Sequence, residues 1–263
     1  MRAYAAVFGA RFRALLQYRA AAAAGLGTQV FWGLIRVMIF GAFYATAPQA
    51  APMSFPQVVT YVWLGQGMIR LLIWRSDPAV EGMIRTGTVA YELVRPVDLY
   101  WLWFSRSAAN LTAPTLLRAV PMYALAGLVL GMEPPASPAA GAAWAASVAV
   151  AVLLATSMCT LASISLLWTI SGEGVSRLLP AAVWCLSGMV IPLPFFPDWA
   201  QPVLRALPFR GMMDLPFRIY IGHLGAGDWA GALGHQAAWA AGLVLLGRWA
   251  LCRGQRRLVV QGG

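Results

Sequence analysis

Six apolar segments dominate the chain, and each is long enough to cross a lipid bilayer. A crossing helix needs roughly 20 predominantly apolar residues, and such segments occur at residues 20–45, 57–74, 109–130, 142–170, 178–195 and 229–251. The chain is only 11% charged, whereas soluble domains carry about 25% charged residues. The sequence therefore predicts an all-α integral membrane protein with six transmembrane helices in a single domain, residues 1–263.

The distribution of arginine predicts how these helices are oriented. All 19 basic residues are arginine, a bias that codon usage in a GC-rich genome explains. The two tails and the second and fourth connections hold 13 arginines, the fifth connection holds three, and the first and third hold none. Because arginine accumulates on the cytoplasmic side, we expect both termini in the cytosol of a bacterial inner membrane. The net charge of +10 does not predict nucleic-acid binding, since the arginines flank apolar segments instead of forming one basic face.

Residues 1–19 are expected to form an amphipathic helix lying in the cytosolic interface. Tyr4, Phe8, Phe12 and Leu15 recur at helical spacing on one face, and polar residues lie off that face. This helix either anchors the chain or contributes to function. A cleaved signal peptide is the alternative, because residues 45–47 resemble a cleavage site. The preceding apolar stretch is too long for a signal peptide, which favours a retained first span.

A cluster of charge between the second and third apolar segments, residues 75–106, predicts an aqueous cytosolic loop. Its charged side chains are Arg75, Asp77, Glu81, Arg85, Glu92, Arg95, Asp98 and Arg106. Both signs of charge suit a specific contact with a partner protein. Gly87 is expected to end one helix of the loop and Pro96 to open the next, while Arg106 is interpreted as an anchor for the third span.

The chain is poor in catalytic groups. His223 and His235 have no ligand or nucleophile at motif spacing, and there is no P-loop, H-E-x-x-H or G-x-S-x-G motif. The three cysteines match no metal or disulfide framework. The sequence therefore predicts no ATPase site, no metal and no cofactor in this chain.

Charged residues inside the apolar segments are candidates for a transport path, because charge is costly in lipid. Arg36 is deep in the first span, with Gln66, Asn110, a backbone carbonyl or an acid of another subunit as candidate partners. Arg70 and Arg118 lie closer to cytosolic ends and can reach the interface by extending their side chains. No Asp or Glu lies in the middle of a span, which argues against a carrier coupled to an ion gradient.

The fifth connection, residues 191–228, is rich in proline and aromatic residues. Prolines break helices and aromatic side chains favour the membrane interface. We expect two short helices that dip into the outer leaflet as a re-entrant segment and turn near Asp198 and Gly211. The alternative is an interfacial aromatic belt without a gating role.

Two sequence blocks carry a resemblance to a known family. The first is Met83-Ile84-Arg85-Thr86-Gly87 with Leu93-Val94-Arg95-Pro96-Val97-Asp98, and the second runs from Gly188 through Pro197 and on to Pro208-Phe209 and residues 216–222. The chain resembles the permease subunits of ABC-2-type exporters, in particular the viologen-exporter-like subgroup of drug and antibiotic exporters. The likeness covers nearly the whole chain.

The resemblance implies a half-transporter that works with other chains. Two ATP-binding subunits would bind ATP and Mg²⁺, and a second permease, identical or homologous, would complete the membrane part. The coupling helix that contacts the ATPase would lie in the second loop, with Glu81, Arg85, Gly87, Glu92, Arg95 and Pro96. An outer gate would contain Pro194, Phe195, Phe196 and Trp199. A substrate path between two permease chains, lined by the second and fifth spans, would contain Arg36, Gln66, Arg70 and Met189.

This interpretation predicts export of an amphipathic or hydrophobic, drug-like or lipid-like molecule by ATP-driven alternating access. Three alternatives stay open. A non-catalytic membrane scaffold would also have six spans and a docking loop. A carrier driven by an ion gradient is disfavoured by the missing intramembrane acid, and an intramembrane enzyme by the missing catalytic pairs.

Overall fold

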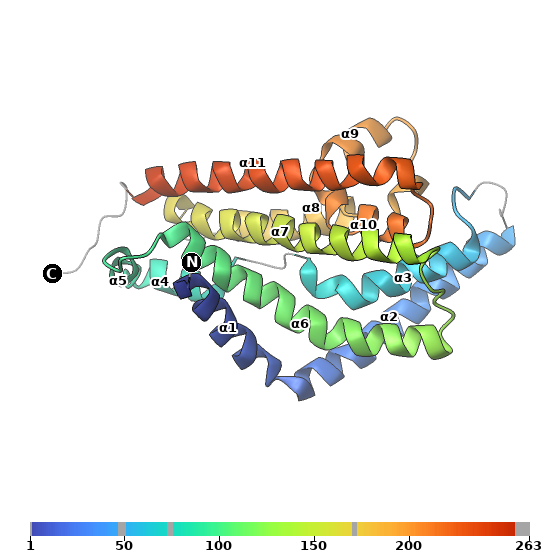
Figure 1. Cartoon of the computed structure of the whole chain (residues 1–263), viewed down its shortest axis with the longest axis horizontal. Coiled ribbons are helices and arrows are strands. Elements are labelled where there is room, and N and C mark those ends of the chain that lie inside the picture. The colour runs from blue at the N-terminus through green and yellow to red at the C-terminus, as the bar shows by residue number, and fades with distance from the viewer. Residues whose placement is uncertain (1, 47–50, 73–75, 170–172, 256–263) are drawn as a thin grey trace.

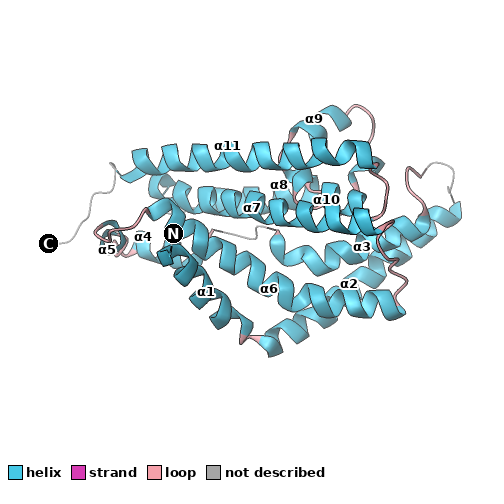
Figure 2. Ribbon diagram, in the orientation of Figure 1, coloured by secondary structure: helices cyan, strands magenta, loops and turns pink. Residues whose placement is uncertain are grey.

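The structure, a computed structural model, describes residues 2–46, 51–72, 76–169 and 173–255. Helices cover 81% of these residues and no strand occurs among them, so the fold is all-α as predicted (Figure 2). The α-helices are α1 (Arg2–Leu16), α2 (Arg19–Thr46), α3 (Phe55–Met68), α4 (Pro78–Arg85), α5 (Ala90–Leu93), α6 (Leu99–Val129), α7 (Pro138–Thr169), α8 (Glu173–Leu186), α9 (Gln201–Ala206), α10 (Asp214–Tyr220) and α11 (Trp229–Gln255). Short 3-10 turns are η2 (Ile69–Leu71), η3 (Leu193–Phe195), η4 (Phe209–Gly211) and η5 (Ala226–Asp228).

Three of the described helices, α2, α6 and α7, are long and apolar enough to cross a membrane. In Figure 1, α7 lies between α6 and α11, and α2 crosses beside α6 and α3. The most apolar stretch of α7 is mostly buried, whereas most of α2 is exposed. The chain is therefore a membrane protein whose core is built around α7 and whose α2 lies at the periphery.

The main core joins α3, α7 and α10. It contains Tyr61 and Leu64 of α3, Leu154 and Met158 of α7 and Phe217 of α10, all buried. Apolar side chains of this size each contribute about 1.5–3 kcal/mol when fully buried. The sequence predicts that residues 191–228 dip partly into the outer leaflet, and within this segment α10 is buried against α3 and α7.

The helices at the second and fifth predicted spans are shorter than expected. α3 starts after the capping residue Ser54, and the chain leaves α-helical geometry at Ile69, while Trp74 lies outside the described residues. α8 ends at Leu186 instead of Phe195, because Gly188 adopts φ +86°, which no helix accommodates, and prolines follow it.

The third predicted span is longer than expected. α6 begins at Leu99, not Ala109, because the Asp98 carboxylate accepts a hydrogen bond from the Trp101 N–H and caps the helix there. Pro96 therefore does not open this helix. The first, fourth and sixth predicted spans agree within a few residues with α2, α7 and α11, apart from Ile170, which lies outside the described residues.

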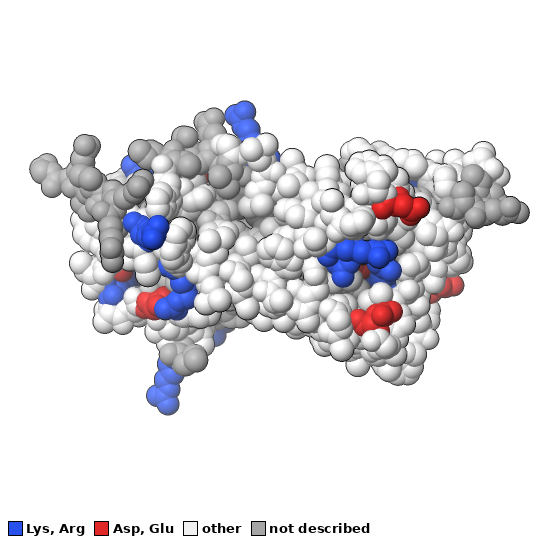
Figure 3. All heavy atoms as spheres, turned by 90° about the horizontal axis from the view of Figure 1, so that it is seen from above, with Lys and Arg blue, Asp and Glu red and all other residues white. Residues whose placement is uncertain are grey.

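Different helices and connections lie at the two ends of the molecule. The start of α1, α4, α5 and the end of α11 lie at one end, whereas the end of α2, the start of α3 and the α6–α7 connection lie at the other (Figure 1). On the face drawn in Figure 3, charged side chains lie towards both ends and uncharged side chains lie between them. This is the distribution expected of a protein with an apolar belt.

The N-terminal helix is amphipathic as predicted. Tyr4, Phe8, Phe12 and Leu15 are the partly buried face of α1, and Phe8 stacks on Phe12 with ring centroids 5.4 Å apart. This face packs along α6, and the Tyr4 hydroxyl accepts a hydrogen bond from the Asp98 N–H at 2.8 Å. The apolar face is therefore covered partly by protein.

Candidate functional site

A large cavity lies between α2 and the rest of the fold. Its volume is about 990 Å³, at the upper end of the range for small-molecule sites. α2 supplies one wall through a stripe of residues three or four apart, which share one helix face: Gly25, Thr28, Gln29, Trp32, Ile35, Arg36, Ile39, Phe40 and Phe43. The sequence predicts a substrate path lined by the second and fifth spans, whereas the wall of this cavity comes mainly from the first span, α2.

The opposite wall combines several elements that are distant in sequence. Its residues are Gln66 of α3, Ile69 and Arg70 of η2, Arg118 of α6, Trp184 of α8, and Val190, Ile191 and Phe195 of the segment that follows α8. The fold thus brings Arg36, Gln66, Arg70 and Phe195 together at one cavity. Met189 is buried and does not line it.

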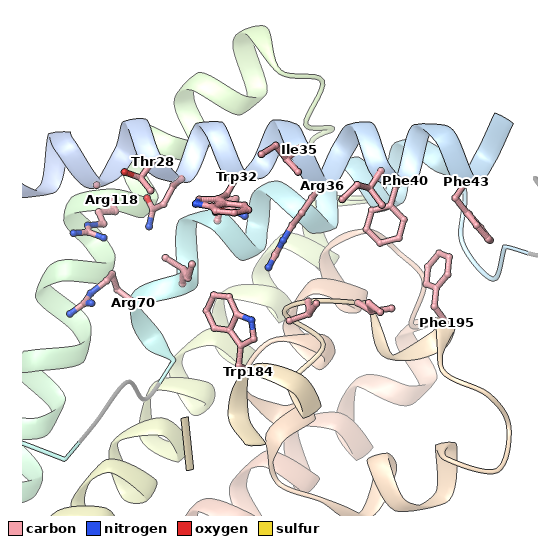
Figure 4. Close-up of a pocket in the computed structure, with 17 residues that line it drawn as sticks. Thr28, Trp32, Ile35, Arg36, Phe40, Phe43, Arg70, Arg118, Trp184 and Phe195 are labelled. Atoms are coloured by element: carbon pink, nitrogen blue, oxygen red, sulfur yellow. The ribbon is translucent and has the colours of Figure 1, made fainter. Parts of the chain in front are cut away.

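Arg36 crosses the cavity from α2 (Figure 4). Its Nη1 donates a 2.7 Å hydrogen bond to the carbonyl oxygen of Met189, and its Cζ lies 5.9 Å from the centroid of the Trp184 ring. The predicted backbone-carbonyl partner is therefore the one observed. One carbonyl uses only one of the five N–H donors of a guanidinium.

Arg70 and Arg118 lie together at one end of the cavity (Figure 4). Gly25 gives the Arg118 guanidinium its space, because a Cβ at that glycine would lie 2.5 Å from Arg118 Cζ. The Nε atom of Arg118 has no hydrogen-bond partner. Arg118, which the sequence predicts to reach the membrane interface, lines the cavity wall.

Phenylalanine side chains form the other end. Phe195 packs against Phe40 and Phe43, with ring centroids 5.6 and 6.0 Å apart, and the three rings face one another in Figure 4. The other predicted gate residues, Pro194, Phe196 and Trp199, do not line the cavity. Trp199 is 81% exposed, so Phe195 is the one of the four predicted gate residues that lines the cavity.

The charged loop folds into two short helices and a glycine turn. Glu81 and Arg85 form an ion pair at 3.1 Å on α4. Gly87 has φ +71°, and its N–H donates to the Ile84 carbonyl, which ends α4 as the sequence predicted. Arg95 and Pro96 are exposed beyond α5. Arg75 lies outside the described residues.

Glu92 differs from the expectation of an exposed docking charge. It is 3% exposed, forms a 2.6 Å ion pair with Arg106 and accepts a 2.8 Å hydrogen bond from Trp103 Nε1. A buried acid is stable only when it is paired in this way. Glu92 and Arg106 therefore fasten α5 to α6, which fits the interpretation of Arg106 as an anchor.

A polar junction at Asn110 ties this loop to three long elements. Asn110 donates to Asp77 Oδ2 at 3.0 Å and accepts from Arg11 Nε at 3.0 Å, and the Asp77 N–H donates to Ser163 Oγ at 3.0 Å. Asp77, at the start of α4, is thereby hydrogen-bonded to α6 and α7 and, through Asn110, connected to α1. Sequence spacing gave no signal for this junction, because its members come from four separate helices or their caps.

A second buried acid, Asp214, holds the segment after α8. It is 1% exposed and accepts hydrogen bonds from the Tyr61 hydroxyl at 3.2 Å, the Leu193 N–H at 3.3 Å and Arg218 Nη1 at 3.4 Å. Asp214 is not among the residues to which the sequence assigns a site role. The one available signal was its spacing four residues before Arg218, which places both on one helix face.

His223 extends this network towards the surface. Its Nδ1 accepts from Arg218 Nε at 3.1 Å, and its Nε2 lies 3.1 Å from the Pro52 carbonyl oxygen. Burial, assisted by the Arg218 cation, lowers the pKa of His223. The neutral ring therefore bridges the outer segment and the α2–α3 connection. In the described part of the chain, no three His, Cys, Asp or Glu side chains group to hold a metal ion.

Comparison with known protein families identifies the family of this chain. Residues 30–262 match the family described as ABC-2 family transporter protein, and the chain belongs to that family. Its members are membrane permease domains that lack an ATPase domain and generally pair with ATP-binding subunits. Neither a search of curated proteins nor a search of solved structures found a match.

Proposed function

We propose that this chain is the permease subunit of an ATP-driven exporter that moves an amphipathic or hydrophobic small molecule out of the cytosol. The observation that carries the proposal is the cavity between α2 and α3–α8, which holds Arg36, Gln66, Arg70 and Phe195. A scaffold protein needs no such cavity. A carrier coupled to protons or sodium would place an acid in it, and no Asp or Glu is among the described residues that line it.

In this proposal the chain crosses a bacterial inner membrane six times with both termini in the cytosol. α2, α3, α6, α7, α8 and α11 supply the spans, and the proline-rich segment from 191 to 228 packs at the outer side as a re-entrant structure. α1 lies along the cytosolic interface. The shorter helix α3 is extended by η2, and α8 by the segment that leads to η3, which would help both to span the membrane.

Coupling to ATP hydrolysis would pass through α4 and the exposed turn after α5. Arg85, Arg95 and Pro96 are positioned to contact one of two ATP-binding subunits, which would hold ATP and Mg²⁺. Glu81 and Gly87 would shape that surface, and Glu92 would support it from inside. The junction at Asn110 offers a route from α4 to the long helices. A second permease, identical or homologous, would complete the complex. The viologen-exporter-like subgroup stays a prediction from sequence.

The proposal is tested by isolating the tagged chain from its own membranes. We expect a protein with a Walker A motif to copurify, and Arg95→Glu to reduce its recovery about tenfold, the loss of about 1.4 kcal/mol at a charged contact. Arg205→Glu on α9, at the opposite side of the fold, is the matched control and should leave recovery unchanged. Transport that survives ATP depletion under an imposed proton gradient would instead support the ion-driven carrier.

A further inference from the structure

Among the residues that the structure describes, the cavity wall carries three positive charges and no negative charge. Arg36, Arg70 and Arg118 line it, and no acidic side chain is among its described lining residues. An arginine remains charged inside a protein, so these three side chains give the described wall a positive potential. A ligand that brings negative charge into this cavity would therefore gain electrostatic stabilisation there, whereas a cation would be repelled.

Two buried glutamines at the same wall, Gln29 and Gln66, have side-chain amide atoms without a hydrogen-bond partner. Gln29 is 4% exposed and neither its Nε2 nor its Oε1 has a hydrogen-bond partner, and Gln66, 1% exposed, has an unpartnered Oε1. Buried polar atoms are almost always hydrogen-bonded in folded proteins. Gln29 Nε2 is a donor, so together with the guanidinium groups it suits an acceptor such as a carboxylate or phosphate oxygen.

The pair Arg70 and Arg118 is separated from the phenylalanine cluster along the cavity (Figure 4). Arg70 and Arg118 lie at one end, with Thr28 nearby, and Phe40, Phe43 and Phe195 lie at the other, with Arg36 between the two ends. This arrangement matches a molecule whose anionic group and apolar body are at opposite ends. The volume of about 990 Å³ accommodates a small amphiphile with one such body.

We propose that the cavity binds an anionic amphiphile, with its carboxylate or phosphate at Arg70 and Arg118 and its apolar body towards Phe43 and Phe195. The inference rests on the proposed function, since it names the class of molecule that the permease would move. It argues against a viologen-like dication as the ligand. The anion belongs either to a membrane lipid headgroup or to a soluble amphiphile, and the two sources share this chemistry.

The test is photolabelling of the whole complex in nanodiscs of phosphatidylcholine. The probes are a palmitate analogue with a diazirine in its chain and the primary amine with the same chain. We expect the carboxylate probe to label α2 and residues 190–195 about tenfold more than the amine, a preference of about 1.4 kcal/mol. Equal labelling, or a preference for the amine, would overturn the proposal.

Variants distinguish the effect of the arginine charges on labelling from the effect of the cavity's shape. Arg70→Gln combined with Arg118→Gln should remove the preference for the carboxylate probe, whereas Arg118→Lys, which keeps the charge, should retain most of it. Gly25→Leu should displace the Arg118 guanidinium and weaken the preference without removing a charge. Phe43→Ala should lower labelling by both probes alike, and Arg205→Gln should change nothing. A preference that persists in the double variant would contradict the assignment.

Competition identifies the source of the anion. Loss of labelling when phosphatidylglycerol replaces part of the phosphatidylcholine supports a lipid headgroup, and loss only with dodecyl phosphate supports a soluble amphiphile. Competition by neither would overturn the proposal. Labelling does not depend on ATP, so a failure of anion selectivity is distinct from a failure of the permease function, which would appear as absence of an ATP-binding subunit.

Discussion

At the scale of single residues, Asp214 connects more of the fold than any acid identified from sequence. Its carboxylate joins α3, the turn at Leu193 and α10 through Tyr61, the Leu193 N–H and Arg218. Loss of the Asp214 carboxylate would leave the Arg218 charge uncompensated and the buried Tyr61 hydroxyl without its acceptor. This makes Asp214 a residue that positions the segment leading to Phe195.

Replacement of Asp214 should therefore destabilise the protein strongly. We expect Asp214→Ala to reduce the free energy of unfolding by about 3 kcal/mol, the usual cost of removing one member of a buried ion pair, and Asp214→Asn to cost less because it keeps one acceptor. The measurement is denaturant or thermal unfolding of the purified protein. Asp198→Ala, at an exposed acid in the same segment, is the control; an equal effect of both alanine variants would show that the network is not responsible.

At the scale of elements, the loop that contains α4 depends on one backbone conformation. Gly87 has φ +71°, and Gly82 lies inside α4; a Cβ at either glycine would meet nothing within 4 Å. The two positions therefore differ in backbone geometry and not in packing.

Alanine at these two glycines should have opposite effects on α4. Gly87→Ala forces a left-handed conformation on a residue with a side chain and should cost about 1 kcal/mol, whereas Gly82→Ala should stabilise the helix by about 0.5–1 kcal/mol. Hydrogen exchange of the α4 amides reports both changes, as faster exchange in Gly87→Ala and slower exchange in Gly82→Ala. A shift in the same direction for both would contradict the role assigned to Gly87.

The residues of α2 that line the cavity could be predicted from the sequence only in part. Thr28, Gln29, Trp32 and Arg36 recur at helical spacing, so their common face was accessible from the sequence once the helix was assumed. Sequence reasoning singled out Arg36 alone, because a polar stripe does not reveal what lies opposite it. Gln66, Arg70 and Arg118 join that stripe only through packing of α3 and α6 against α2.

At the scale of the whole molecule, the proposed orientation places the charged loop and the outer segment on opposite sides of the membrane. We expect a single cysteine at Trp199 to react with a membrane-impermeant maleimide on intact cells, and one at Arg95 to react only after permeabilisation. Both positions are exposed. The native cysteines must be replaced first, since Cys185 and Cys252 are exposed. Reaction of Arg95→Cys from outside would reverse the proposed topology.

The sequence by itself determined that this is a helical membrane protein, because the length and apolar character of a segment are local properties that the bilayer constrains directly. It also located the amphipathic α1 and the end of α4 at Gly87, which depend on periodicity and one backbone angle. The tertiary structure alone decided that Glu92 and Asp214 are buried, that α10 lies in the core, and that α2 lines the cavity with Arg118. These features depend on side chains from distant segments packing together, and no local pattern encodes which segments meet.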